Sequence, residues 1–380
     1  MKKILVIHNK YRETGGEDIA VSNEIKLLEQ KFKVKVLYFD NNISNLFLQS
    51  FYFATNRNKK SINLLKQLID DFNPDIVYVH NTWFKASLGI FELLKNKNIK
   101  VILKLHNFRY FCTKSYFSKN HVLVDNVCEA CGYKGSKRIL NKYFNNSIAK
   151  SLLISRYGVK YFQILKNYDF KLLVLTNFHK KFLEDLNIDS EKIEIVPNFI
   201  KKYIHRENVE SNYIVYAGRI SKEKGIEELL EIFLKAKING INLKIIGSGP
   251  DLNKLREKYK DDSINFLGKL NNEETIELIK HSLAVVTATK LFEGQPTLLC
   301  EASSLGVPSI FPRTGGISEF FPSNYPLSFE QFNYQDLLAK LLKVQDIHKM
   351  KKIGISNHEY ISDYLDQEKL LHKFWQFTND

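Results

Sequence analysis

Two glutamates near the start of a predicted helix form the most informative motif of this sequence. Glu293 and Glu301 have seven residues between them, and the glycine- and proline-containing turn there indicates a helix that begins near Thr297. Unpaired N–H groups and the positive end of the helix dipole favour an anion or a hydroxyl-rich sugar at this point. The other residues expected to face such a ligand are Gly294, Gln295, Pro296, Thr297 and Leu298. For this motif taken alone, a chance spacing of two surface carboxylates is the alternative.

Two cations follow an earlier predicted strand. Arg219 and Lys224 lie five residues apart, around a turn after the strand expected at Tyr213–Ala217. Arginine offers a bidentate fork and lysine a point charge, so the pair could hold a diphosphate. A loop with ordinary solvated cations is the alternative.

A glycine pair lies between the first predicted strand and its helix. Gly15 and Gly16 permit close backbone approach to a phosphate or a sugar, and the following helix N-terminus supplies positive potential. A plain glycine turn with Asp18 as the helix N-cap is the alternative. Glu17 adds negative charge beside the supposed phosphate site. Which group of the ligand this loop contacts is therefore left open.

Histidines end two of the predicted strands. His106 follows the strand at Lys100–Leu105, where it could bind a sugar hydroxyl or help to stabilise charge that develops at an anomeric carbon. A structural histidine is the alternative. His80 and Asn81 end a neighbouring strand and are candidates for an acceptor side, to which Arg109 is also assigned.

The cysteines allow a metal site. Cys112, Cys128 and Cys131 lie close in the sequence with His121 among them, and these four residues could form a tetrahedral structural zinc site. Reduced thiols packed in a loop are the alternative. Four cysteines in 380 residues do not make a disulfide framework.

Short β-branched runs alternate with longer amphipathic stretches, which is typical of parallel sheets covered by helices. The predicted strands are Lys3–His8, Lys33–Phe39, Asp75–His80, Lys100–Leu105, Leu172–Thr176, Ile193–Val196, Tyr213–Ala217, Leu243–Gly247, Asn265–Leu267, Ala284–Ala288 and Pro308–Phe311. The predicted helices include Asp18–Gln30, Ser61–Asp71, Gly225–Lys237, Asp251–Lys260, Asn272–Lys280 and Thr297–Leu305. We therefore expect two doubly wound α/β domains, 1–198 and 199–357, that face each other across a cleft, with a helical segment 358–380 that crosses back to the first domain.

Taken in order, the motifs resemble those of glycosyltransferase family 4, retaining enzymes with the two-Rossmann (GT-B) fold. The Glu-x7-Glu stretch is similar to the family signature, and Arg219 with Lys224 is similar to its basic pair. Phe199 departs from the pattern, which has a small residue after the asparagine of the interdomain element. The Gly-Gly-Glu-Asp and Leu-His-Asn-x-Arg…Cys-x2-Cys motifs resemble one subgroup. Further segments that match in order are Ile246–Pro250, Phe266–Leu270 and Gly315–Glu319.

The resemblance implies a nucleoside-diphosphate sugar as donor and transfer with retention at the anomeric carbon. Glu293 would orient the sugar and Glu301 the ribose, while Arg219 and Lys224 neutralise the departing diphosphate. The chain has no Asp-x-Asp pair to hold a divalent cation, so no catalytic metal and no other cofactor is expected. The remaining residues that the resemblance assigns to the donor are Gly15, Gly16, His106, Gly247, Lys269 and Leu270. A sugar-nucleotide epimerase or a phosphorylase of the same architecture is an alternative.

The charge balance bears on partners and location. The chain has 56 Lys+Arg and 42 Asp+Glu residues, which gives a formal net charge of +14. This surplus favours a phosphorylated substrate or an anionic membrane face as partner. A compositional bias toward lysine is the alternative. The lysines are scattered and form no RNA-binding signature, so no nucleic-acid partner is expected, although a non-catalytic basic protein that binds membrane or nucleic acid is a further alternative.

The resemblance and the charge together imply a glycan or lipid-linked acceptor in the synthesis of lipopolysaccharide, capsule or other surface polysaccharide. A helix at Lys137–Leu165, with Arg156 and Tyr157, could lie on anionic headgroups; a helix packed on its own domain is the alternative. The apolar run before His8 is too short for a signal peptide, so we expect a cytoplasmic protein, peripheral on the inner face of the plasma membrane.

Overall fold

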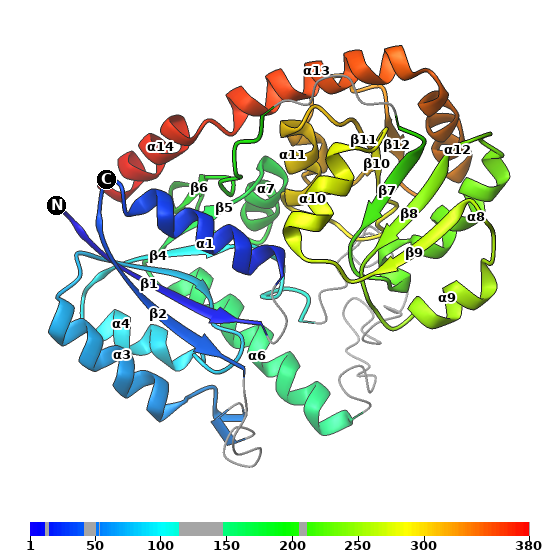
Figure 1. Ribbon diagram of the computed structural model, residues 1–380. Helices are drawn as coiled ribbons and strands as arrows, with labels where there is room; N and C mark the ends of the chain where they lie inside the picture. The colour runs from blue at the N-terminus through cyan, green and yellow to red at the C-terminus, as the bar shows by residue number, and fades with distance from the viewer. Residues whose placement is uncertain (12–14, 42–50, 53, 114–146, 205–210, 380) are drawn as a thin grey trace. The chain divides into compact units, whose positions relative to one another are not determined.

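The computed structural model describes residues 1–11, 15–41, 51–52, 54–113, 147–204 and 211–379 (Figure 1). It divides into two compact units: the first consists of Met1–Phe199 with Gln367–Asp380, and the second of Ile200–Asp366. The chain thus changes unit at residues 199/200 and 366/367, close to the expected boundary at 198 and nine residues after the expected start of the returning segment at 358.

The first unit contains a parallel six-stranded sheet in the order β2-β1-β3-β4-β5-β6. Its two middle strands are buried along nearly their whole length, as expected for a sheet with helices on both faces. The strand order reverses between β1 and β3, so the loops that follow these two strands lie next to each other. The strands are β1 (Lys3–Lys10), β2 (Lys33–Asp40), β3 (Ile76–Asn81), β4 (Lys100–Leu105), β5 (Lys171–Val174) and β6 (Ile193–Ile195).

The second unit contains a parallel six-stranded sheet in the order β12-β11-β10-β7-β8-β9. Its order reverses between β7 and β10. The edge strand β12 (Ser328–Glu330) was not predicted, because three residues are too few to show a period. The other strands are β7 (Tyr213–Ala217), β8 (Asn242–Ile246), β9 (Ile264–Gly268), β10 (Val285–Val286) and β11 (Ser309–Arg313).

Side-chain caps fix where several helices of the first unit begin. Asn58 accepts hydrogen bonds from the N–H groups of Lys60 and Ser61 at the start of α3, and Thr176 accepts one from His179 at the start of α7. The helix predicted at Lys137–Leu165 begins at Ile148 in the structure, because Ser147 is its N-cap and accepts the Lys150 N–H. Residues 137–146 lie outside the described residues. The helices are α1 (Gly16–Leu28), α3 (Lys59–Phe72), α4 (Gly89–Asn96), α6 (Ile148–Asn167), α7 (Asn177–Asp185) and α14 (Gln367–Asn379), with a 3-10 turn η1 (Ser190–Lys192).

Helices of the second unit alternate with its strands. Asn271 and Glu274 form a reciprocal capping box at the start of α10. Among the described residues, none of the helices is both long enough and apolar enough to cross a membrane. The helices are α8 (Ile226–Ala236), α9 (Leu252–Lys258), α10 (Asn272–Lys280), α11 (Thr297–Ser304), α12 (Tyr334–Leu342) and α13 (Ile347–Tyr364), with 3-10 turns η2 (Lys222–Lys224), η3 (Ile317–Phe320) and η4 (Lys343–Gln345).

The last helix completes the core of the first unit. Figure 1 shows α14, at the red end of the chain, beside α1. The Phe374 ring is fully buried, 5.2 Å from the Tyr78 ring centroid, and 6.1 Å from that of Phe32. The Lys100 Nζ donates to the Thr378 carbonyl at 2.8 Å and the Lys171 Nζ to the Phe377 carbonyl at 3.2 Å. These ammonium groups satisfy carbonyls that a helix C-terminus leaves without partners.

Candidate functional site

The loops after β7 and β10 bring Lys224 of the predicted basic pair into contact with Glu293. Lys224 lies in η2, after β7, and its Nζ hydrogen-bonds to Glu293 Oε1. The Thr289 hydroxyl donates to the same carboxylate oxygen at 3.0 Å. The carboxylate is thus held by a cation and a hydroxyl at the point where the strand order reverses, the place where open α/β sheets bind ligands.

Arg219 lies on the same loop and its side chain is exposed. Among the described residues its guanidinium has no hydrogen-bond or ion-pair partner, while its carbonyl accepts from the Tyr216 hydroxyl at 2.8 Å. The backbone is therefore fixed and the five guanidinium N–H donors are available to a ligand.

The predicted glycine turn after β8 has a packing reason. A Cβ on Gly247, whose φ is +140°, would lie 1.9 Å from the Gly218 carbonyl oxygen. Ile220 donates its N–H to the Ser248 carbonyl at 2.9 Å. The turn thus brings the β8 loop against the loop that carries Arg219, and this contact alone accounts for the glycine.

A second glycine turn holds Glu293 by its backbone. Gly315 has φ +56°, and a Cβ there would lie 2.2 Å from the Glu293 carbonyl oxygen. The Gly316 N–H donates to that same oxygen at 2.8 Å. The Gly315-Gly316 motif after β11 therefore positions the Glu293 loop.

Glu301 lies inside α11, as expected, and only 5% of its surface is exposed. Burial raises the pKa of Glu301 to about 7. The helix N-cap, Pro296, provides no side-chain bond to the first N–H groups. Gly294, Gln295, Thr297 and Leu298 are half-buried at this end of the helix, as is Leu270 after β9, whereas Lys269 is exposed.

In the first unit, two predicted histidines contact each other. His80 ends β3, His106 follows β4, and their rings stack with 2.9 Å between His80 Nδ1 and His106 Nε2. Burial lowers the pKa of both imidazoles well below the usual value; the charges of His106 on His80 and of Lys104 on both add to this effect. Both rings are therefore neutral near pH 7, and His106 can act on a ligand as a hydrogen-bonding group.

A buried ion pair lies beside the histidines. Lys104 and Glu24 are fully buried with 2.9 Å between Lys104 Nζ and Glu24 Oε2, and the Tyr78 hydroxyl donates to the other carboxylate oxygen at 2.6 Å. The ammonium also lies 3.4 Å from the Pro197 carbonyl oxygen and over the Phe199 ring. Phe199, which stands where the family pattern has a small residue, is thus buried against this lysine.

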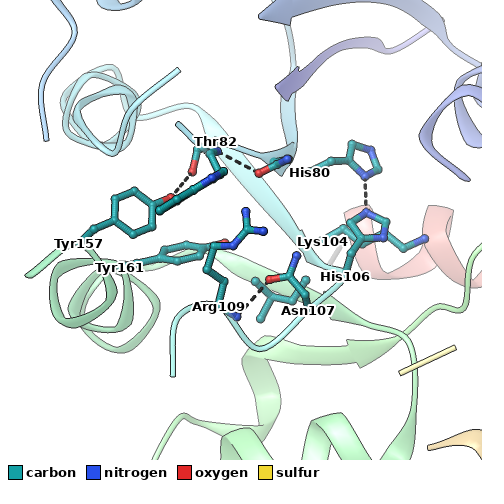
Figure 2. Close-up of a pocket in the computed structure, with 11 residues that line it drawn as sticks. His80, Thr82, Lys104, His106, Asn107, Arg109, Tyr157 and Tyr161 are labelled. Atoms are coloured by element: carbon teal, nitrogen blue, oxygen red, sulfur yellow. Dashed lines mark hydrogen bonds between the residues drawn. The ribbon is translucent and has the colours of Figure 1, made fainter. Parts of the chain in front are cut away.

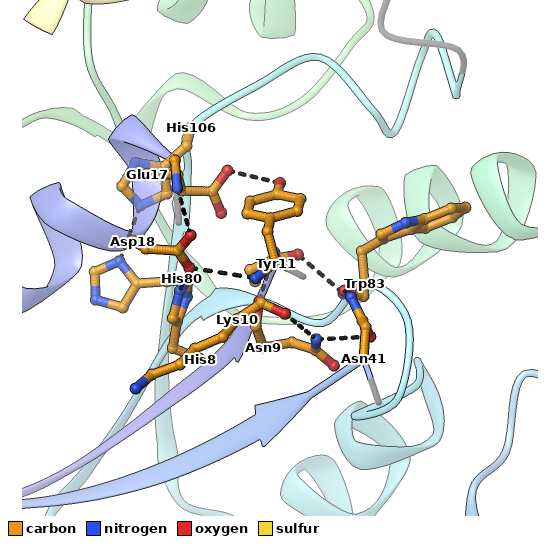
Figure 3. A network of polar contacts seen from close by, with 12 residues as sticks. His8, Asn9, Lys10, Tyr11, Glu17, Asp18, Asn41, His80, Trp83 and His106 are labelled. Carbon is orange, nitrogen blue, oxygen red and sulfur yellow. Dashed lines mark hydrogen bonds and ion pairs between the residues drawn. The ribbon is translucent and has the colours of Figure 1, made fainter. Parts of the chain in front are cut away.

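The glycine loop does not have the Asp18 cap of the alternative interpretation. Gly15, not Asp18, is the N-cap of α1, and Asp18 accepts the Gly15 N–H at 2.9 Å. The other oxygen of Asp18 lies 2.8 Å from His8 Nε2 (Figure 3). A Cβ on Gly16 would meet no atom within 4 Å, so packing among the described residues does not account for that glycine. Thr14 lies outside the described residues.

Figure 2 shows the pocket around Arg109. The guanidinium points toward the middle of the pocket, with Tyr157 and Tyr161 on one side and Asn107 on the other. Tyr157 is only 2% exposed, so the prediction that this side chain faces lipid headgroups is wrong. The residues that line the pocket are His80, Asn81, Thr82, Trp83, Lys104, Leu105, His106, Asn107, Arg109, Tyr157 and Tyr161.

The predicted zinc ligands are mostly outside the described residues. This applies to His121, Cys128 and Cys131, while Cys112 is described and buried. Among the described residues, His, Cys, Asp and Glu side chains form no group that could hold a metal ion. The zinc prediction therefore stays a prediction.

Several site residues were not predicted. Tyr11 and Trp83 follow β1 and β3, the two strands between which the order of the first sheet reverses, and this position is the signal that could have found them. Lys104 is a charged residue in the buried part of a strand whose neighbouring residues, Leu103 and Leu105, are apolar, which signals a buried partner such as Glu24.

The second unit is similar in sequence to a family of known proteins. Residues 199–358, nearly the whole second unit, match the family model described as "Glycosyl transferases group 1". The gpi3 subunit of phosphatidylinositol N-acetylglucosaminyltransferase from Schizosaccharomyces pombe is 28% identical over 146 residues, or 36% of this chain and 32% of that protein. The chain thus spans about a third of the length of this curated relative.

Solved structures are similar over the full chain. Sucrose-phosphate synthase from Thermosynechococcus elongatus has a TM-score of 0.73 at 16% identity and covers 100% of this chain and 98% of its own. Anabaena HepE in complex with UDP-glucose has a TM-score of 0.70 at 12% identity and covers 100% of both chains. These likenesses and the two sheets confirm the predicted fold of two Rossmann-like domains, as in GT-B glycosyltransferases.

Proposed function

We propose that the protein is a retaining glycosyltransferase that moves a sugar from a nucleoside-diphosphate sugar to a glycan or lipid-linked acceptor. The observation that carries the proposal is the pairing of Lys224 with Glu293 beside the exposed guanidinium of Arg219, at the strand-order reversal of the second unit. This arrangement lies within the range that matches the glycosyltransferase family model.

Charge on the leaving diphosphate is the main quantity that such a site must stabilise. Arg219 offers five N–H donors in a planar fork, and Lys224 adds an ammonium whose partner, Glu293, can turn to the sugar hydroxyls. The backbone N–H groups at the start of α11 supply a further fixed positive potential. In this proposal, these groups replace the divalent cation that an Asp-x-Asp pair would hold.

The ribose and the transferred sugar are assigned to the remaining predicted groups. Glu301 would accept hydrogen bonds from the ribose hydroxyls, and His106, neutral near pH 7, would contact the donor sugar. Gly16, which has open space beside it, would let the α1 N-terminus approach the donor or the acceptor. The acceptor would lie on the first unit, near Asn81 and Arg109.

The names of similar proteins support the choice of substrates. HepE was solved with UDP-glucose, and a matching protein from Erwinia amylovora is an amylovoran biosynthesis glycosyltransferase. By analogy we propose a uridine nucleotide as the first candidate donor, and a role in the synthesis of surface polysaccharide or lipopolysaccharide at the cytoplasmic face of the membrane.

A nucleotide panel tests the donor site. We expect UDP or another nucleoside diphosphate to raise the melting temperature with or without a chelator, since a ligand that binds only the folded state stabilises it by mass action. Arg219→Ala should abolish this rise. The matched control is Arg256→Ala on α9, whose guanidinium donates to the Phe266 carbonyl and lies over the Phe266 ring; this variant should leave the rise intact. No response to any nucleotide in the wild type contradicts the proposal.

The helix α6 supports a membrane-facing surface. Ile148, Leu152 and Val159 share one face of the helix and are 52%, 50% and 42% exposed, and Lys150 and Arg156 are exposed on the same helix. We expect the protein to sediment with vesicles that contain anionic lipid and to dissociate as salt is raised. Leu152→Glu should weaken this binding, with Leu64→Glu on α3 as the control, since Leu64 is equally exposed at 47%. Equal sedimentation of both variants would contradict the assignment of this face.

A further inference from the structure

The pocket around Arg109 is lined by cationic and neutral polar side chains. Its lining includes Arg109, Lys104, two histidines and two asparagines, but no aspartate or glutamate. The Lys104 ammonium is already neutralised by Glu24. Arg109 is therefore the cation of this pocket that no carboxylate among its described lining residues neutralises.

The Arg109 side chain is held in place by aromatic rings. Its guanidinium lies 4.8 Å from the Trp83 ring centroid and 5.8 Å from that of Tyr11. Stacking on ring faces fixes the plane of a guanidinium and leaves its N–H groups, which lie in that plane, free to point outward. A fork that is immobilised in this way loses little conformational entropy when it binds a ligand.

The Glu17 carboxylate is linked to the Arg109 guanidinium through the Tyr11 hydroxyl group. The Tyr11 hydroxyl donates to Glu17 Oε2 at 2.9 Å (Figure 3). The same hydroxyl accepts from Arg109 Nη2 at 3.4 Å. Asn107 also donates to Glu17, at 3.3 Å, and its Oδ1 accepts the Arg109 backbone N–H at 3.0 Å. Among the described residues no carboxylate forms an ion pair with Arg109, and Tyr11 is the only hydrogen-bond partner of its guanidinium. Because one of five N–H donors is used, four are left for a ligand.

Buried polar atoms without partners add to this set of groups. The Nε2 atom of His80 and the Nδ1 atom of His106 are buried and have no hydrogen-bond partner among the described residues. Both histidines line the same pocket as Arg109. Polar atoms in this state are unusual in folded proteins, and a ligand or water would satisfy them.

We propose that this pocket binds an anionic group of the acceptor, a carboxylate or a phosphate, through the Arg109 guanidinium. The inference rests on the proposed function, since it names the chemical class of the acceptor. A planar fork matches the two oxygens of a carboxylate or a phosphate, and Asn81 and Asn107 provide amide groups for neighbouring hydroxyls. The acceptor is thus an acidic sugar or a sugar that carries a phosphate.

A matched pair of ligands tests the proposal in the full-length protein. Methyl β-glucuronide and methyl β-glucoside differ in that one carries a carboxylate where the other carries a hydroxymethyl group. We expect calorimetric titration or ligand-observed NMR to give at least about tenfold tighter binding of the glucuronide to the wild type. Glucose 1-phosphate, with inorganic phosphate as its own control, is the second arm. Tighter binding of glucose 1-phosphate than of the glucuronide identifies a phosphate-bearing acceptor, and the reverse identifies an acidic sugar.

Variants assign the effect to Arg109. Arg109→Gln should abolish the preference for the charged ligand, and Arg109→Lys, which keeps the charge without the fork, should retain part of it. Arg256→Gln on α9 is the matched control and should keep the full preference. Equal binding of glucuronide and glucoside by the wild type, or an unchanged preference in Arg109→Gln, overturns the proposal.

The response to UDP, measured on the same samples, separates this proposal from the proposed function. We expect the UDP-induced rise in melting temperature to be unchanged in Arg109→Gln, because the nucleotide is assigned to the second unit. A preserved anion preference with no response to UDP in any variant would contradict the glycosyltransferase proposal and leave the anion site standing. If Arg109→Gln does not fold, Arg109→Lys carries the test alone, and an unchanged preference in that variant counts against the bidentate fork.

Discussion

Replacing Glu293 by glutamine should lower kcat/KM for sugar transfer by at least about 100-fold, a loss of about 2.7 kcal/mol of transition-state stabilisation. The carboxylate is held by Lys224 and by the Thr289 hydroxyl, and its loop is fixed by the Gly316 N–H. Glutamine keeps the shape but removes the charge, so the sugar loses a strong acceptor and Lys224 loses its ion-pair partner. Binding of free UDP should change by less than about threefold, because UDP has no sugar at this position.

The measurement is the rate of UDP release with the nucleotide sugar that gives the largest thermal shift. Glu273→Gln, an exposed glutamate in the first turn of α10, is the matched control and should have wild-type activity. Full activity of Glu293→Gln would remove Glu293 from the reaction. A parallel loss of UDP affinity would show instead that Glu293 supports the shape of the nucleotide site.

Replacing Glu301 by glutamine should stabilise the protein and weaken nucleotide binding. Burial raises the folded-state pKa of Glu301 to about 7, above the ordinary value of 4.5. A raised carboxyl pKa contributes stability below pH 4.5 that is lost as pH rises through 7, because the folded state must then hold a buried charge. The glutamine variant avoids this loss, and we expect its free energy of unfolding at pH 8 to exceed that of the wild type by about 2–3 kcal/mol.

Two pH series check this expectation. In denaturant unfolding, the stability difference between Glu301→Gln and the wild type should be present at pH 8 and nearly absent at pH 4.5. In nucleotide titrations, wild-type affinity should rise from pH 6 to pH 8, since the ionised carboxylate accepts hydrogen bonds from both ribose hydroxyls, while the affinity of the variant should stay flat. A pH-independent stability difference would mean that the pKa of Glu301 is the same in the folded and unfolded states.

The motifs of the second half could be found from the sequence because each one lies in a loop that follows a strand. Arg219 after β7, Gly247 after β8 and Glu293 after β10 lie at carboxyl ends that a parallel sheet brings to one edge. The sequence did not reveal what the glycines do. Gly247 is needed because a neighbouring carbonyl lies where its Cβ would be, and such a contact joins residues that are distant along the chain.

The site of the first half was harder to predict. The positions of His80 and His106 at strand ends were expected, but their contact, and the low pKa values that follow from burial, depend on the pairing of β3 with β4. Tyr11, Trp83 and Tyr157 come from two loops and a helix, and no spacing relates them. Asp18 was considered as the N-cap of α1 only in the alternative of a plain glycine turn; in the structure Gly15 takes that position, and Asp18 pairs with His8.

The return of the chain to its first unit has a consequence for biosynthesis. Phe374 packs in the same core as Tyr78 and Phe32, but the whole second unit lies between them in the sequence. At ribosomal rates of roughly 5–20 residues per second, the time from the appearance of Phe199 to that of Phe374 is on the order of ten to thirty seconds. During that interval the nascent first unit lacks Phe374, and the apolar surface that this side chain covers is exposed. The unit that is translated first is therefore the unit that is completed last.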